Sequence, residues 1–334
     1  RAFIINTGSA NAGTGKKGID DAKEICKVLA NNLKLNDDDI LPFSTGVIMT
    51  PLPTNKIKES ITFLVDNLNA NNWLDAAEAI MTTDTIPKAL STSGMIDEDE
   101  IHVTGISKGS GMINPNMATM LAFIGTNANI NAEMLQELTK EVTEKTFNKI
   151  SVDGETSTND SFIIAATNKA NHKQITSKNK HYDKLKDLVI DNAKHLSQAI
   201  VRDGEGATKF IEILVEQGKN EKECHEIAKV IANSPLVKTA FFASDPNLGR
   251  ILAALGNVQI ENLDLSIVNI FLNELLFAEK GSVAEDYTEF KGKEEMNKNE
   301  IFLKIQMGRG EATSVMWTSD LSYDYVKINS EYRT

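Results

Sequence analysis

Residues 108–123 read KGSGMINPNMATMLAF, a glycine-rich turn that leads through Pro115 into an apolar strand. The glycines free the backbone before the proline ring fixes it, and the small pair Ala118-Thr119 then stands at the start of the strand. This order places one hydroxyl group, that of Thr119, at the edge of a predicted sheet. By its spacing alone, the stretch is typical of an ordinary turn that enters a strand.

A threonine in this position can also be a nucleophile, provided that a base activates its hydroxyl. One chemical solution is cleavage of the preceding peptide bond, because the freed α-amine of the threonine then serves as the base. That amine has a reference pKa near 7.7–8.0, against about 10.4 for lysine, so more of it is neutral at cellular pH. The stretch alone leaves both interpretations open.

On either side of this stretch, helices and strands alternate. The spacing of apolar residues predicts amphipathic helices at 19–33, 54–68, 73–81, 132–147, 182–200 and 221–232. Strand-like runs lie at 2–5, 101–105, 120–124, 161–167, 210–216, 239–243, 265–271, 301–307 and 312–317. Segments 168–180 and 279–300 are poor in apolar residues and are expected to be exposed connections. The mixture predicts an α/β or α+β fold.

Composition restricts the classes of partner. The 334 residues are 41% hydrophobic, enough for one large core or two smaller ones. A net charge of -12 argues against nucleic acid, which requires clustered Lys and Arg. No run approaches the roughly 20 apolar residues of a membrane span, so no membrane partner and a cytoplasmic location are expected. Because the chain starts at Arg1, directly before the first strand, we also expect a missing upstream segment.

The sequence predicts no metal site and no disulfide. Cys26 and Cys224 lack CxxC or Cys/His ligand spacing, which fits a reducing compartment. Asp153-Gly154-Glu155 with Asp160 does not follow the spacing of a calcium loop, and a polar turn is predicted there. The five histidines fall in no ligand pattern: His102, His172, His181, His195 and His225.

A dinucleotide-binding loop is the main alternative from short motifs. Residues 13–18, GTGKKG, formally satisfy GxGxxG, follow a predicted strand, open a helix and precede Asp37-Asp38-Asp39 by about twenty residues. The fingerprint requires its first glycine in the tight turn directly after the strand, whereas residues 6–12 intervene here. The match is therefore interpreted as coincidental.

The chain resembles the ornithine acetyltransferases, also called glutamate N-acetyltransferases, over nearly its whole length. The matching stretches are NTGSANA at 6–12, STGVI at 44–48, MTTD at 81–84, residues 108–123, SVDGETSTND at 151–160, DGEGATK at 203–209, VKTA at 237–240, SDPN at 244–247 with Gly249-Arg250, and NSEYRT at 329–334. So many matches in order are typical of common descent. Two positions depart from the usual pattern. Met49, directly after the STGVI motif, stands where a small residue is usual, and Leu248 replaces a common Trp.

The resemblance implies a fold and a processing event. The family fold is a four-layer α/β/β/α sandwich, distantly shared with self-processing aminopeptidases. Autoproteolysis between Ala118 and Thr119 would give an α chain of residues 1–118 and a β chain of 119–334. The two chains would form one intertwined unit with a smaller C-terminal region, and two of each would form an α2β2 heterotetramer.

The resemblance also implies the chemistry. Thr119 takes acetyl from N2-acetyl-L-ornithine, and glutamate collects it, which gives N-acetylglutamate for arginine biosynthesis. The oxyanion of acyl transfer needs donors, and the family's pair falls on Thr45 and Gly46. Substrate contacts carried over from the family fall on these residues: Thr82, Lys108, Thr119, Glu205, Asn329 and Thr334. Lys108 suits a carboxylate, and Glu205 suits an ammonium group.

No metal or organic cofactor is expected, and the sequence leaves open whether acetyl-CoA is a second donor. Two other function classes are weighed. A self-processing amidohydrolase or aminopeptidase of the same fold would resolve the acyl-enzyme with water, but those relatives use serine. A non-enzymatic binding protein is disfavoured because Thr45, Gly46, Lys108, Thr119 and Glu205 are all retained.

Overall fold

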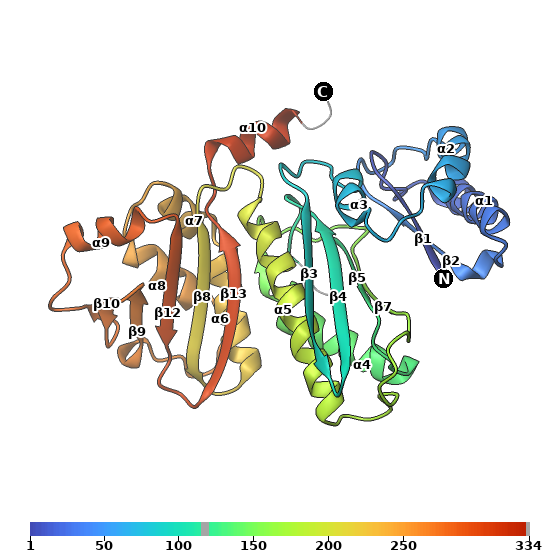
Figure 1. Cartoon of the computed structure of the whole chain (residues 1–334). Helices are drawn as coiled ribbons and strands as arrows, with labels where there is room; N and C mark the ends of the chain where they lie inside the picture. Colours follow the sequence, from blue (N-terminus) through green and yellow to red (C-terminus); the bar gives the residue numbers. More distant parts are fainter. Residues whose placement is uncertain (115–119, 332–334) are drawn as a thin grey trace. The chain divides into compact units, whose positions relative to one another are not determined.

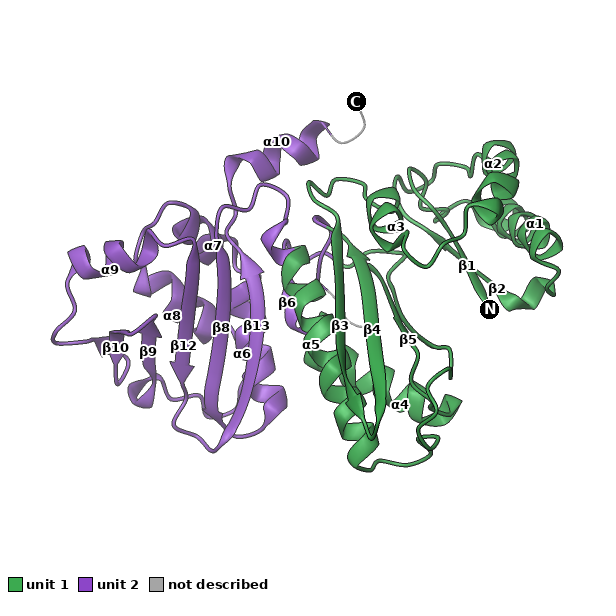
Figure 2. Cartoon of the chain, in the orientation of Figure 1, with its two compact units in different colours: residues 1–109, 115–147, 156–200 green, residues 110–114, 148–155, 201–334 purple. Residues whose placement is uncertain are grey.

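The computed structural model describes residues 1–114 and 120–331 and divides into two compact units (Figure 2). The described residues of unit 1 are 1–109, 120–147 and 156–200, and those of unit 2 are 110–114, 148–155 and 201–331. Each unit therefore contains residues from both sides of the predicted cleavage point.

Unit 1 is built on a four-stranded sheet of order β3-β4-β5-β7 (Figure 1). Its strands are β3 (Lys88–Ile96), β4 (Asp99–Lys108), β5 (Leu121–Thr126) and β7 (Ser161–Ala166). Neighbouring strands β3, β4 and β5 are antiparallel, and β7 adds to β5 in parallel. The helices of the unit are α1 (Gly15–Leu33), α2 (Thr54–Asp66), α3 (Trp73–Ala79), α4 (Ala132–Lys145) and α5 (Lys180–Arg202).

Two glycines mark the faces of this sheet. A Cβ on Gly105 of β4 would lie 2.8 Å from Leu196 of α5, whereas one on Gly125 of β5 would lie 3.2 Å from Trp73 of α3. Gly105 pairs with Ile124, the neighbour of Gly125. Because successive residues of a strand point to opposite faces, α5 and α3 cover opposite faces of the sheet.

The N-terminal strands pack on the face that carries α3. Strands β1 (Ala2–Asn6) and β2 (Ile40–Ser44) form a two-stranded parallel sheet joined by α1. Phe3 of β1 and Phe43 of β2 contact Phe123 of β5, with ring centroids 5.6 and 4.9 Å away. These aromatic contacts hold β1 and β2 against the central sheet.

Unit 2 contains a seven-stranded sheet of order β11-β10-β9-β12-β8-β13-β6. Pairs β12–β8 and β13–β6 are parallel, and the other four pairs are antiparallel. The strands are β6 (Ile150–Ser151), β8 (Phe210–Gly218), β9 (Asn269–Leu272), β10 (Leu275–Glu279), β11 (Ser282–Val283), β12 (Glu300–Gln306) and β13 (Ala312–Ser319). The helices are α6 (Glu221–Ala232), α7 (Pro235–Phe242), α8 (Leu248–Gly256), α9 (Glu289–Met296) and α10 (Tyr323–Glu331).

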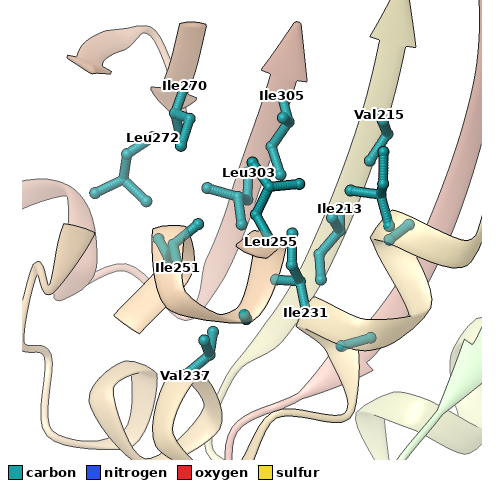
Figure 3. Packing of buried hydrophobic residues seen from close by; sticks show 14 of the residues in the cluster. Ile213, Val215, Ile231, Val237, Ile251, Leu255, Ile270, Leu272, Leu303 and Ile305 are labelled. Atoms are coloured by element: carbon teal, nitrogen blue, oxygen red, sulfur yellow. The ribbon is translucent and has the colours of Figure 1, made fainter. Parts of the chain in front are cut away.

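The core of unit 2 follows from the register of three central strands. Leu303 of β12 lies opposite Ile213 of β8 and Leu272 of β9, which makes one apolar row across the sheet. All three side chains are fully buried. Helices α6, α7 and α8 cover these rows with apolar residues that Figure 3 shows facing the strands, among them Ile231, Val237, Ile251 and Leu255.

Three expectations about elements are wrong. Residues 239–242 are helical and Ala243 caps the helix, because Ser234 accepts a hydrogen bond from the Val237 amide and Pro235 occupies the first turn, a combination typical of a helix start. The strand expected at 265–271 is right only at 269–271, which belong to β9, because Leu265–Ile267 form a 3-10 turn instead. The predicted connection at 279–300 contains β11 and α9.

The mixed α/β class is confirmed. Cys26 and Cys224 are free and buried. Within residues 1–114 and 120–331, no helix is long and apolar enough to cross a bilayer.

Candidate functional site

The ammonium group of Lys108 gathers two of the predicted site threonines in unit 1. Its Nζ donates to Thr82 Oγ1 at 2.7 Å and to Thr45 Oγ1 at 3.2 Å. The Lys108 side chain is 10% exposed. Three residues that the sequence placed in one site thus lie within hydrogen-bonding distance, although they are far apart along the chain.

Strand register explains this meeting. Lys108 is the last residue of β4 and pairs with Leu121, which belongs to the apolar cluster that also contains Ala77 of α3. The side chain of Lys108 therefore leaves the sheet on the face covered by α3, β1 and β2. Thr82 follows the end of α3, and Thr45 follows the end of β2, so both hydroxyls arrive on this face.

Gly46 sits in a turn that admits no other residue. Its φ is +131°, and an added Cβ would lie 2.4 Å from the carbonyl carbon of Gly8. The Thr45 amide donates to Asn6 O at 3.0 Å, and the Val47 amide donates to Gly8 O at 3.3 Å. The predicted oxyanion pair Thr45-Gly46 is thereby held against the loop that follows β1.

A buried carboxylate stands behind Lys108. Asp84 Oδ1 accepts from Lys88 Nζ at 2.6 Å and from the Gly109 amide at 2.6 Å, and Oδ2 accepts from the Thr82 amide at 3.1 Å. Burial acts to raise the pKa of Asp84, but Lys88, Lys108 and the Gly109 amide outweigh it, so this pKa lies below its usual value. The carboxylate is therefore ionised at neutral pH.

This arrangement places two threonine hydroxyls on one ammonium group. A hydroxyl that accepts from an ammonium group still carries its own proton, and it becomes a stronger donor because the hydrogen bonds polarise one another. Thr45 and Thr82 can therefore stabilise negative charge that develops on a carbonyl oxygen, with the Lys108 charge behind them. The cluster suits acyl transfer to or from an amine.

In unit 2, two other predicted residues meet. Asn329 of α10 donates from Nδ2 to Glu205 Oε2 at 2.7 Å. Glu205 is 8% exposed, and its amide donates to Ser110 O at 2.8 Å. A Cβ on Gly111 would lie 2.4 Å from the Glu205 carboxylate carbon, so glycine is required there unless that side chain moves. The carboxylate and amide form a polar pair suited to an ammonium group.

Asp153 anchors the backbone that precedes the predicted cleavage point. Its Oδ2 accepts from the Met112 amide at 2.6 Å, and its Oδ1 accepts from the Ile113 amide at 2.9 Å. Tyr325 of α10 donates its hydroxyl to Asp153 Oδ2 at 3.3 Å. Met112 holds a left-handed φ of 55°, a conformation that costs a non-glycine residue roughly 1–3 kcal/mol.

Three predicted residues, Ala118, Thr119 and Thr334, lie outside the described residues. The sequence interpretation gave no role to Asp84 and Lys88, and it treated Asp153 only as part of a polar turn. The signal for Asp84 and Asp153 was present, since each stands inside one of the family-like stretches. The carboxylates of Asp84 and Asp153 accept hydrogen bonds from backbone amides, a role that residue type alone does not reveal.

The alternatives from short motifs receive no support. The loop from residue 7 to residue 14 separates β1 from α1, and its Ser9 bridges to Thr45 and Val47 rather than forming a tight turn. Among residues 1–114 and 120–331, no three His, Cys, Asp or Glu side chains lie together in a way that could hold a metal ion.

Comparison with known proteins identifies the family. The model of the ArgJ family matches residues 1–334. The chain belongs to the ArgJ family. The arginine biosynthesis bifunctional protein ArgJ of Colwellia psychrerythraea is 50% identical over 340 residues, which cover 100% of this chain and 80% of the relative. The ArgJ of Neisseria meningitidis serogroup A is also 50% identical, with 82% of the relative covered.

A solved ArgJ structure shares the fold. The crystal structure of ArgJ from Bacillus halodurans aligns with a TM-score of 0.60 at 32% identity and covers 62% of this chain and 97% of that one. The resemblance inferred from the motifs is confirmed. Both relatives carry the name arginine biosynthesis bifunctional protein.

Proposed function

We propose that the protein moves acetyl from N2-acetyl-L-ornithine to L-glutamate through an ester on Thr119. The observation that carries this proposal is that the Lys108 ammonium group donates hydrogen bonds to the hydroxyls of Thr45 and Thr82. An amide is a poor acyl donor unless its carbonyl oxygen is stabilised, and preorganised donors provide that stabilisation. The Glu205–Asn329 pair supports the choice of substrates, since N2-acetyl-L-ornithine and L-glutamate each carry an ammonium group.

The two half-reactions balance through one side chain. Thr119 Oγ bonds to the acetyl carbon, its proton passes to the base, the C–N bond of the amide breaks, and ornithine leaves with the proton on its α-amine. The α-amine of glutamate then attacks the ester carbonyl, and the threonine oxygen leaves and regains a proton. The α-amine of Thr119 is the base in both steps. The proposed cycle uses only the hydroxyl and α-amine of Thr119 as nucleophile and base, so we propose no metal or organic cofactor.

Processing precedes this cycle. Thr119 Oγ attacks the carbonyl carbon of Ala118, the peptide nitrogen becomes the free α-amine, and water hydrolyses the resulting ester. The mature protein then has an α chain of 1–118 and a β chain of 119–334. Support comes from Asp153, which binds the amides of Met112 and Ile113 and so fixes the segment before the cleavage point.

The decisive assay measures ornithine release from N-acetylornithine with and without glutamate. Glutamate-dependent release, matched by N-acetylglutamate, is the expected result. Equal release without glutamate would show that water resolves the ester, which is the behaviour of an amidohydrolase of this fold. No release at all would leave a binding protein. A parallel reaction with acetyl-CoA and glutamate decides whether a second donor is used.

The proposed assembly is α2β2, as in the family. Native mass spectrometry of the cleaved protein measures this directly, with two copies of each chain expected. We also propose a cytoplasmic location, on the acidic composition and the soluble substrates.

A further inference from the structure

Two lysines approach one buried carboxylate in unit 1, at different distances. Lys88 Nζ lies 2.6 Å from Asp84 Oδ1, whereas Lys108 Nζ lies 3.9 Å from Asp84 Oδ2. The side chains of Lys88 and Asp84 are both 0% exposed. At 3.9 Å the Lys108 contact is not a hydrogen bond, and its ammonium protons go instead to Thr82 and Thr45.

The ion pair between Lys88 and Asp84 accounts for the greater distance of Lys108 from this carboxylate. Attraction between unit charges is strong in a buried site, and an ionised carboxylate there requires a cation close by. Lys88 meets that requirement at one oxygen of Asp84, while the other oxygen accepts the Thr82 amide. Without Lys88, the nearest described cation to Asp84 is Lys108, which would then move from the two hydroxyls toward the carboxylate.

We infer that Lys88 is a positioning residue for acyl transfer, which holds Lys108 on Thr45 and Thr82 by occupying Asp84. The inference rests on the proposed function, because it assumes that these hydroxyls stabilise the acyl oxygen. Asp84 contributes in a second way, since it also fixes the Gly109 amide directly after Lys108 and the Thr82 amide beside the Thr82 hydroxyl. A displaced Lys108 would weaken both donors in the transition state.

The test compares a single and a double variant. Lys88→Met removes the ammonium group and should lower kcat for glutamate-dependent ornithine release by about 10²-fold, the scale on which one oxyanion donor acts. Asp84→Asn combined with Lys88→Met removes the carboxylate charge that attracts Lys108. The amide oxygen still accepts the Gly109 N–H, whereas the acceptor of the Thr82 N–H is lost, so the recovery is partial. The double variant should therefore recover at least about tenfold of the lost kcat.

This recovery distinguishes positioning from a structural role. If the pair served stability alone, the double variant would be no more active than Lys88→Met, and that result would overturn the inference. Unchanged kcat in Lys88→Met would overturn it as well. Should Lys88→Met fail to fold, the double variant still decides, since an inactive but folded double variant contradicts the inference. Thermal denaturation of each variant establishes folding.

A matched control comes from α1. Lys17 and Asp21 form an ion pair with the same four-residue separation at 2.7 Å, but the Lys17 side chain is 71% exposed. Lys17→Met should leave kcat and KM unchanged. A wild-type protein that releases no ornithine would reject the proposed function itself, whereas an active wild type with an equally active Lys88→Met rejects only the role of Lys88.

Discussion

At the scale of single residues, the proposed mechanism gives one hydroxyl two tasks. Thr119 Oγ would attack first the carbonyl of Ala118 and later the acetyl carbonyl, so chain cleavage and acetyl transfer should disappear together. We expect wild-type protein to run on a denaturing gel as fragments 1–118 and 119–334, and Thr119→Ala to run as one inactive chain. Thr119→Ser loses the methyl group that restrains χ1 and should cleave slowly and partially. An active Thr119→Ala protein would disprove the mechanism.

Glu205 should matter for substrate use and not for chain cleavage. Glu205→Ala removes the carboxylate that pairs with Asn329, so KM for N-acetylornithine should rise by tenfold or more, the usual effect of losing a charged hydrogen bond. Gly111→Ala tests the same site without mutating Glu205, because its new Cβ would lie 2.4 Å from the Glu205 carboxylate carbon and displace that side chain. Enzyme kinetics measures both, with surface variant Glu226→Ala as control. Normal KM in both variants would remove Glu205 from the site.

At the scale of elements, helix α10 carries Asn329, a proposed substrate contact, and Tyr325, whose hydroxyl donates to Asp153. Removing residues 329–334 should lower turnover and leave cleavage intact. Tyr325→Phe should have a smaller effect of the same kind, since it deletes only the hydroxyl that Asp153 accepts. Normal turnover in the truncated protein would mean that α10 takes no part in the reaction.

The start of α7 offers a measurement of local stability. Ser234 Oγ accepts the Val237 amide, and replacing a serine cap with alanine costs about 1 kcal/mol. Urea unfolding of Ser234→Ala should show this loss, whereas Ser177→Ala, at an exposed loop position, should show none. An unchanged midpoint would contradict the role of Ser234 as a cap.

How far the sequence predicts these elements depends on what stabilises each of them. Helix 221–232 is predicted to the residue, and the other five amphipathic helices to within four residues at each end, because apolar periodicity locates a helix better than it defines its ends. Strand β2 was missed because Pro42 interrupts it, which an edge strand tolerates. The strand prediction at 239–243 is wrong because the aromatic and apolar residues there favour a strand locally, while the Ser234 cap and the packing against α8 favour a helix. In the site, residue types and motifs located Lys108 and Thr45, but the Asp84–Lys88 pair depends on distances that only folding creates.

At the scale of the whole molecule, one histidine makes the stability of the fold depend on pH in the acid range. Burial, with help from Lys149 and Lys229, lowers the pKa of His225 from 6.5 to about 4. The unfolded chain therefore binds more protons than the folded one between these values, so this contribution to stability is complete above about pH 6.5 and is lost as pH falls toward 4. His225→Gln should flatten the dependence of the melting temperature on pH in that window, whereas His102→Gln, 57% exposed, should not. Identical pH profiles for wild type and His225→Gln would refute this.

The two buried cysteines provide an intrinsic probe of each unit. Cys26 lies in unit 1 and Cys224 in unit 2, and burial raises the pKa of both thiols, which keeps them protonated and slow to react. A thiol-reactive dye should label either one only after the surrounding unit has opened. Labelling rates followed by peptide mass spectrometry would thus time the opening of each unit separately in one unmodified protein, and would reveal whether cleavage before Thr119 loosens one unit more than the other.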